Sequence, residues 1–243
     1  MAVTMHAHSI RQTLRSLANP SIAAHSLRFF KTGPGQYGEG DQFLGIRVPV
    51  LRSHLPTFRD APLAAVLETL RSPWHEERLF ALLLMVARFP RADQQARDAL
   101  YGAYLAHTAH INNWDLVDCS AHHIVGATLE QRDRAILREL ARSESVWERR
   151  IAIIATFHFI RQSSFDDCLE VAELLLADRH DLMHKAVGWM LREVGKRNPE
   201  IEEQFLRRHA PRMPRVMLRY AIEKFPELKR KNYLQATMGS TKK

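Results

Sequence analysis

The feature that most constrains this chain is an amphipathic helical segment that recurs at intervals of 33 to 40 residues. The recurring segments begin near Trp74, Trp114, Trp147, Met183 and Val216. Their apolar residues follow the three- and four-residue spacing of a helix face, and no stretch alternates apolar and polar residues as a strand does. Helix pairs with this spacing bury their apolar faces by stacking on their neighbours. The sequence therefore predicts an all-α fold, an α-solenoid of helical repeats.

Short motifs place several helix ends. Ser72-Pro73 predicts a capped helix start with proline in the first turn. Ser145 and Glu148 form a capping box ahead of an apolar run. Asn198-Pro199 predicts the end of one helix and the start of the next.

Glycines mark one irregular region. Five of the ten glycines lie between Gly33 and Gly45, which predicts a loop between helices. The loop lacks the Gly-Lys-Ser/Thr ending of a phosphate-binding loop, so we expect no nucleotide cofactor.

The length of 243 residues suffices for one large domain or two small ones. We expect a single repeat domain over residues 1–235 and a flexible C-terminal tail over residues 236–243, because the tail has little to bury. The two cysteines, Cys119 and Cys168, are too few for a disulfide scaffold or a cysteine zinc site. We interpret both as packing residues and expect no bound metal.

Apolar runs in the sequence are short. The longest, Phe80 to Ala87, lies between Arg78 and Arg88 and falls far short of the roughly 20 residues that a membrane span needs. The stretch from Met1 to Ser9 has neither the basic nor the apolar region of a signal peptide. We therefore expect a cytoplasmic protein without a membrane partner.

The chain is basic, and the excess charge is concentrated near its C-terminus. The net charge is +8, and residues 197–243 hold twelve Lys or Arg against five Glu, a balance of +7. This region contains the closely spaced arginines Arg207, Arg208, Arg212, Arg215 and Arg219. Arginine binds phosphate oxygens in pairs, so the pattern favours a polyanionic partner. The alternative is a solvated helix face.

Trp189 lies on an unexpected face of the helix predicted over residues 182–196. The apolar stripe of this helix contains Met183, Val187, Met190, Leu191 and Val194. Trp189 instead shares the opposite stripe with Lys185, Arg192 and Lys196. Two interpretations remain open. The indole either has a functional role on this basic face or packs against a neighbouring repeat.

A second unusual stripe lies in the helix predicted over residues 112–126. Its buried side contains Leu116, Val117, Ser120, Ala121 and Ile124. Trp114, Asp118 and His122 share a neighbouring stripe nearer the surface. Asp118 is then either a functional carboxylate or the partner of His122 in a surface contact. The adjacent His122 and His123 are predicted to face different sides, so they form no metal pair.

Arg149 and Arg150 fall in the first turn of an otherwise apolar helix. Cations there oppose the helix dipole, but a bound phosphate at the same helix end reverses that balance. The alternative is an ion pair with Glu148 or Asp118.

These residues carry a resemblance to a known family. The segments Phe43 to Pro49, Trp114 to Asp118, Trp147 to Arg150 and Lys185 to Glu193 are similar to those of the AlkD family of DNA alkylation repair proteins. The resemblance covers about residues 10–230. Because members of that family are HEAT-like-repeat DNA glycosylases, it implies a HEAT-like solenoid with a concave, basic DNA-binding face.

The resemblance also implies the site residues. It assigns Asp118, Trp114 and Trp189 to catalysis and Arg150 to a phosphate that flanks the lesion. Phe29 replaces a tyrosine that approaches DNA in the family and so lacks its hydroxyl. The DNA-binding residues are then expected to be Arg150, Arg149, Lys185, Arg192, Lys196, Arg47 and Phe29.

The implied reaction is hydrolysis of the N-glycosidic bond of alkylated purines such as 3-methyladenine and 7-methylguanine. The alkylated base is cationic and leaves readily, while Asp118 stabilises the oxocarbenium-like sugar and Trp114 and Trp189 offer their π faces. The resemblance implies capture of the lesion without a base-flipping pocket. We expect double-stranded DNA with alkylated bases as partner, an abasic product, a monomeric protein, association with the nucleoid and no cofactor.

Two other classes of function stay open. A noncatalytic relative would use the same basic surface to bind damaged, bent or branched DNA. A helical solenoid can also serve as a protein-binding scaffold, because this fold hosts many functions.

Overall fold

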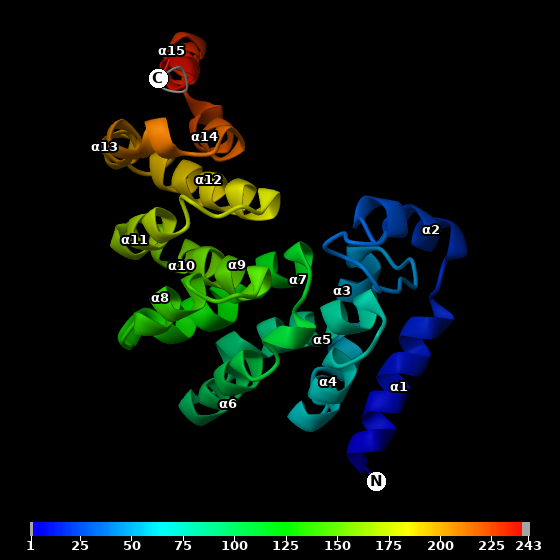
Figure 1. Ribbon diagram of the computed structural model, residues 1–243. Coiled ribbons are helices and arrows are strands. Elements are labelled where there is room, and N and C mark those ends of the chain that lie inside the picture. The colour runs from blue at the N-terminus through cyan, green and yellow to red at the C-terminus, as the bar shows by residue number, and fades with distance from the viewer. Residues whose placement is uncertain (1, 240–243) are drawn as a thin grey trace. The chain divides into compact units, whose positions relative to one another are not determined.

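The computed structural model describes the backbone of residues 2–239 and the side chains of residues 6–235 (Figure 1). The chain forms two compact units, Met1–Ile124 and Val125–Lys243, which we call the N-terminal and C-terminal units. Apart from an isolated bridge between Gln42 and Trp74, the described residues form helices, turns and loops, with no strand among them. The predicted all-α fold is therefore confirmed.

The N-terminal unit is built around α5, whose side chains are buried over most of its length. Its core residues include Phe80, Leu82 and Leu84, which are fully inaccessible to solvent. α5 packs against α3, α4 and α7, and α1 packs against α4 and α5. The helices of this unit are α1 (Ala2–Ser16), α2 (Pro20–Phe29), α3 (Val48–Phe58), α4 (Leu63–Leu70), α5 (His75–Arg88), η1 (Phe89–Arg91), α6 (Gln94–Leu105), η2 (Thr108–His110) and α7 (Trp114–Asp118).

The C-terminal unit is a series of helices in which α12 packs against α9, α11, α13 and α14 (Figure 1). Its helices are η4 (Leu129–Gln131), α8 (Ala135–Ala141), α9 (Val146–Ala155), α10 (Phe157–Ile160), α11 (Asp166–Leu174), α12 (Asp181–Gly195), α13 (Pro199–His209), η5 (Ala210–Arg212), α14 (Arg215–Ala221), η6 (Ile222–Lys224) and α15 (Glu227–Gly239). The π-helix η3 (His122–Gly126) spans the boundary between the units.

The helical repeat read from the sequence matches the helices of the structure. The five recurring segments correspond to α5, α7, α9, α12 and α14. In α12 the predicted apolar stripe of Met183, Val187, Met190, Leu191 and Val194 is buried, as expected for a core face.

Two of the three predicted helix starts are confirmed. Asn198 caps α13 by accepting a hydrogen bond from Ile201 N, and Ser145 caps α9 by accepting one from Glu148 N. The prediction at Ser72-Pro73 is wrong, because α5 begins at His75. The Ser72 hydroxyl instead accepts from Trp74 N and donates to the buried carboxylate of Glu77, which draws it away from the helix end.

Both cysteines are free, and Cys168 is buried whereas Cys119 is half-buried. Burial raises the pKa of Cys168 to about 12, which keeps the thiol protonated. No described helix has the length and apolar character that crossing a membrane requires. The predicted tail at residues 236–243 overlaps the end of α15, and residues 240–243 lie outside the described part.

Candidate functional site

The short helix α7 carries Trp114 and Asp118 four residues apart, so the two side chains lie on neighbouring turns of one face. Asn113 caps the helix, because its Oδ1 accepts a hydrogen bond from Trp114 N at 2.9 Å. Leu116 and Val117 are buried, whereas Trp114 and Asp118 are half-buried. The structure thus confirms that these two residues share a partly exposed stripe.

The predicted regular helix over residues 112–126 is wrong beyond Asp118. α7 ends there, a turn follows at Cys119 and Ser120, and a π-helix begins at His122. Ser120 Oγ donates to Leu116 O at 2.5 Å and contacts the Tyr104 hydroxyl at 2.9 Å, which competes with regular helical bonding. His122 is half-buried and lies outside the regular helix that carries Trp114 and Asp118.

His122 and His123 also depart from the predicted orientation. Their ring centroids are 3.9 Å apart, so the two rings lie side by side rather than on opposite faces. No group of His, Cys, Asp or Glu side chains among the described residues is arranged to hold a metal ion.

Two aromatic residues at the end of α2 pack against Trp114: Phe29, the last residue of the helix, and Phe30, which follows it. Phe30 stacks on the indole with ring centroids 5.4 Å apart and an angle of 22° between the planes. Phe29 approaches edge-on at 5.9 Å and is itself 56% exposed. The indole is half-buried, so part of it is open to solvent.

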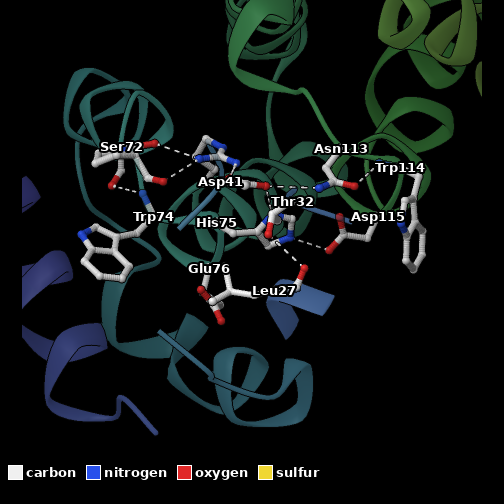
Figure 2. Close-up of polar contacts among 12 residues, drawn as sticks. Leu27, Thr32, Asp41, Ser72, Trp74, His75, Glu76, Asn113, Trp114 and Asp115 are labelled. Carbon is white, nitrogen blue, oxygen red and sulfur yellow. Dashed lines mark hydrogen bonds and ion pairs between the residues drawn. The ribbon is translucent and has the colours of Figure 1, made fainter. Parts of the chain in front are cut away.

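Beneath α7 lies a buried polar network centred on His75, the first residue of α5 (Figure 2). His75 Nδ1 lies 3.0 Å from Asp41 Oδ2, and His75 Nε2 lies 2.8 Å from Asp115 Oδ2. Burial alone lowers the pKa of His75, but the charges and hydrogen bonds of Asp115 and Asp41 outweigh it and raise the pKa to about 9. His75 is therefore a cation that donates to two carboxylates.

Asp41 connects this network to two further side chains, those of Asn113 and Arg78. Its carboxylate accepts from Asn113 Nδ2 at 3.2 Å and pairs with the guanidinium of Arg78, which also donates to Ser72 O and Pro73 O. Burial opposes ionisation of Asp41, yet His75 and Arg78 together lower its pKa. The network joins the loop after α2, the start of α5 and the cap of α7.

The next residue of α5, Glu76, holds the backbone of the segment Phe43 to Pro49. Its carboxylate accepts hydrogen bonds from Leu44 N at 2.8 Å, Gly45 N at 2.7 Å and Ile46 N at 3.2 Å. Gly45 has a φ of +80°, and a Cβ there would lie 2.2 Å from Asn19 O. Only glycine fits at this position. Arg47 occupies the N-cap position of α3, and its exposed side chain makes no capping hydrogen bond.

In the C-terminal unit, α9 carries Arg149 and Arg150 in its first turns. Arg150 is only 5% exposed and donates from Nη1 to Leu182 O at 2.7 Å. Arg149 Nε donates to Asp178 Oδ2 at 2.6 Å, and its Nη1 donates to the carbonyls of Ser143 and Glu144. Both arginines are thus positioned by contacts with neighbouring segments.

The predicted basic stripe of α12 is a row of ion pairs. Lys185 pairs with Asp181, Arg192 with Glu223 and Lys196 with Glu193. Trp189 is half-buried beside this row, donates from Nε1 to Glu193 Oε1 at 3.2 Å and lies 6.2 Å from the Phe157 ring. The indole is therefore oriented by a carboxylate of its own helix.

Gly188, the residue before Trp189, allows α14 to approach α12 closely. A Cβ at Gly188 would lie 2.4 Å from Met217 O and 2.5 Å from Tyr220 Cβ. The glycine in the segment Lys185 to Glu193 is thus a packing requirement of this helix pair.

The C-terminal arginines make different contacts. Arg207 pairs with Glu203, Arg212 contacts His209, and Arg215 donates to Leu234 O. Arg208 and Arg219 are exposed.

Comparisons with known proteins identify the family of the chain. Residues 10–225 match the sequence profile of the family described as DNA alkylation repair enzyme. The chain belongs to this family. No curated protein sequence matches it. Among solved structures, it is similar to one titled "Predicted DNA alkylation repair enzyme from Enterococcus faecalis", with a TM-score of 0.67, 18% identity and coverage of 86% of this chain and 97% of the other.

The site residues expected for a DNA alkylation repair protein fall in both units. Trp114, Asp118, Arg47 and Phe29 belong to the N-terminal unit. Arg149, Arg150, Lys185, Trp189, Arg192 and Lys196 belong to the C-terminal unit. Their roles in catalysis and in DNA binding stay predictions.

Sequence reasoning missed the buried network. Its members Asp41, His75, Arg78, Asn113 and Asp115 were not among the expected residues. One signal was available: His75-Glu76-Glu77-Arg78 is a run of four ionisable residues that opens an otherwise apolar helix. All four side chains are buried. Buried charges require partners, so this run indicates a polar network.

Proposed function

We propose that this member of the DNA alkylation repair family is a monofunctional DNA glycosylase that releases cationic alkylated purines, of the 3-methyladenine and 7-methylguanine type, from duplex DNA. The observation that carries the proposal is the pairing of a half-buried carboxylate, Asp118, with a half-buried indole, Trp114, on one helix face. The family match supports DNA as the partner.

Asp118 acts on the sugar in this proposal. A purine methylated at N3 or N7 already carries a positive charge, so its departure needs no proton from the protein. As the bond between C1′ and the base nitrogen lengthens, the sugar becomes oxocarbenium-like, and a nearby carboxylate stabilises that charge. Both bond electrons leave with the base, water adds to C1′ and loses a proton, and the products are the free base and an abasic site.

Trp114 binds the cationic nucleotide through its uncovered π face. Phe30 fixes the plane of the indole from one side, which leaves the opposite side for the lesion. A cation–π contact of this kind contributes about 0.5 to 2 kcal/mol. Trp189, oriented by Glu193, is proposed to serve in the same way from the C-terminal unit.

Arg150 is proposed to hold a phosphate that flanks the lesion. Its bond to Leu182 O limits the orientations of the guanidinium, so less side-chain entropy is lost when it binds a phosphate. Exposed cations such as Arg47 supply further phosphate contacts. We propose that the protein acts as a monomer in the cytoplasm, near the nucleoid, and captures the lesion without a base-flipping pocket.

The test is release of free 7-methylguanine and 3-methyladenine from methylated duplex DNA by the purified protein. Asp118→Asn keeps the size of the side chain but removes its charge, so we expect base release to fall by roughly 10²- to 10³-fold with little loss of DNA binding. Asp98→Asn, on the exposed face of α6, is the matched control and leaves release unchanged. Release that is independent of Asp118 contradicts the mechanism.

A protein that binds the DNA in a salt-sensitive manner but releases no base contradicts the glycosylase proposal. That result would favour a noncatalytic binder of damaged, bent or branched DNA. Binding that does not weaken with salt would instead favour a protein-binding scaffold, because phosphate contacts release counterions.

A further inference from the structure

A pocket of the N-terminal unit that the proposed reaction does not use lies between α3 and α5. It has a volume of about 570 Å³ and is lined by four arginines, Arg52, Arg59, Arg88 and Arg91, and by a single carboxylate, Asp60. The remaining lining is mostly apolar, including Leu55 and Leu84. Four cations against one anion give this pocket a net charge of +3.

Arg88 is the fixed cation of the pocket. It is the last residue of α5, it is half-buried, and its Nη2 donates to Phe58 O at 3.1 Å. Its Nε is buried and has no hydrogen-bond partner. Burial lowers the pKa of Arg88, and the charge of Asp60 opposes this shift. Because the Phe58 carbonyl already holds the guanidinium in place, Arg88 loses less side-chain entropy when it binds an anion.

The one carboxylate of the pocket compensates little of this charge. Asp60 pairs with Arg59 at 3.4 Å, but its side chain is 91% exposed, and a pair in water is weak. Arg52 and Arg91 are exposed and form no ion pair among the described residues. Arg52 also lies close enough to Cys119, the residue after Asp118, for its charge to act against the rise in the pKa of that thiol.

Helix dipoles explain only part of the arrangement. Cations at helix C-termini are favourable, which accounts for Arg88 at the end of α5 and Arg59 at the end of α3. Arg52 lies in the first half of α3, where the dipole does not favour a cation. Its place beside the other three arginines therefore points to a ligand.

We propose that this pocket binds a phosphate group, with the arginines on its oxygens and the apolar lining against an attached sugar or base. Guanidinium groups match phosphate geometry and are weakly hydrated, whereas a carboxylate ligand would not need four of them. The phosphate comes either from a DNA strand or from a free nucleotide. The strand source rests on the proposed function, but phosphate binding itself does not.

The first arm of the test titrates deoxyadenosine monophosphate into the full chain and follows the Nε–Hε signal of Arg88 by NMR. We expect a saturable shift of that signal. Arg52 and Arg91 are exposed, so we expect the double variant Arg52→Gln, Arg91→Gln to keep the fold. We expect this variant to bind the nucleotide roughly tenfold or more weakly. Arg142→Gln, an exposed arginine at the end of α8, is the matched control and leaves binding unchanged.

The second arm measures the salt dependence of binding to undamaged duplex DNA. If the phosphate belongs to a strand, the double variant lowers the slope by about two relative to Arg142→Gln. An unchanged slope with weakened nucleotide binding assigns the pocket to free nucleotides. The proposal is overturned if neither the Arg88 signal nor the slope responds. Because no arm requires base release, this outcome is distinct from failure of the glycosylase proposal.

Discussion

His75 Nε2 and Asp115 Oδ2 lie 2.8 Å apart, which joins the first residue of α5 to the residue after Trp114. The other ring nitrogen of His75 lies 3.0 Å from Asp41 Oδ2, so the imidazolium is held from both sides (Figure 2). The position of α7, and with it Trp114 and Asp118, therefore depends on the charge of one buried histidine.

This arrangement predicts a loss of stability at alkaline pH. The pKa of His75 is raised from 6.5 to about 9, so the folded protein holds this proton more tightly than the unfolded chain does. The stabilisation is complete below pH 6.5 and is lost as the pH rises to about 9. It is on the order of a few kcal/mol, because one pKa unit corresponds to about 1.4 kcal/mol. Thermal unfolding across this range measures the effect.

His75→Gln is the variant that isolates the contribution of the His75 proton to stability. The glutamine amide can donate hydrogen bonds but carries no charge, so the variant loses stability below pH 6.5 and shows a flatter profile up to about pH 9. His54→Gln, on the exposed part of α3, is the control with an unchanged profile. Equal slopes in His75→Gln and the parent protein would show that His75 does not carry the charge.

Packing at Gly188 predicts a second effect. In Gly188→Ala the new methyl group meets Met217 O at 2.4 Å, and a backbone atom cannot move aside cheaply. We expect a destabilisation of about 1 to 3 kcal/mol, the usual cost of overpacking, despite the higher helix propensity of alanine. Chemical denaturation measures it. Gly102→Ala, where a Cβ meets nothing within 4 Å, is the control and is neutral or stabilising. A neutral Gly188→Ala would contradict the close packing.

Much of the fold could be predicted because its signals are local. The stripe of Met183, Val187 and Met190 follows the 3.6-residue period of a helix. The cap at Asn198 is recognised from two adjacent residues, Asn198 and Pro199. Both depend on few tertiary contacts. The start of α5 could not be placed in this way, because the buried carboxylate of Glu77 takes the hydroxyl of Ser72.

The site was predictable only where a helical pattern was broken. Trp114 and Asp118 were predicted to share a stripe beside the buried side of their helix, nearer the surface. Both side chains are half-buried in the structure. The Asp41–His75–Asp115 contacts join positions 34 and 40 residues apart, which no local periodicity reports. The Tyr104–Ser120 contact, just before the π-helix, likewise joins two segments that local periodicity does not connect.

Phe29 predicts a separable effect on binding. Its ring packs edge-on to Trp114 and is 56% exposed, so a hydroxyl added at its tip meets solvent or DNA. We expect Phe29→Tyr to tighten binding to methylated duplex DNA by a few-fold, the effect of one added hydrogen bond of about 0.5 to 1.5 kcal/mol, without a change in the release rate. Titration and single-turnover release measure the two quantities. Phe29→Leu, which adds no hydroxyl, is the control and does not tighten DNA binding. If Phe29→Tyr changes only the release rate, the assignment of Phe29 to binding is contradicted.

Glu202 predicts a second pH effect, in the C-terminal unit. The carboxyl group is 2% exposed, and its Oε1 has no hydrogen-bond partner among the described residues. Burial raises the pKa of Glu202 from 4.5 to about 8, against the charges of Lys229 and Arg192. The folded state therefore keeps a proton that the unfolded chain has lost, and stability falls as the pH rises from 4.5 to about 8.

Glu202→Gln removes this titration, because its amide is neutral at every pH and nearly isosteric with the protonated acid. We expect the variant to exceed the parent protein in stability at about pH 8, by on the order of a few kcal/mol, and to match it near pH 4.5. The difference between the two unfolding curves cancels the contribution of His75. Glu200→Gln, exposed on the same helix, gives no such difference. A constant difference across the pH range would show that Glu202 is ionised in the folded protein and is stabilised by Lys229 and Arg192.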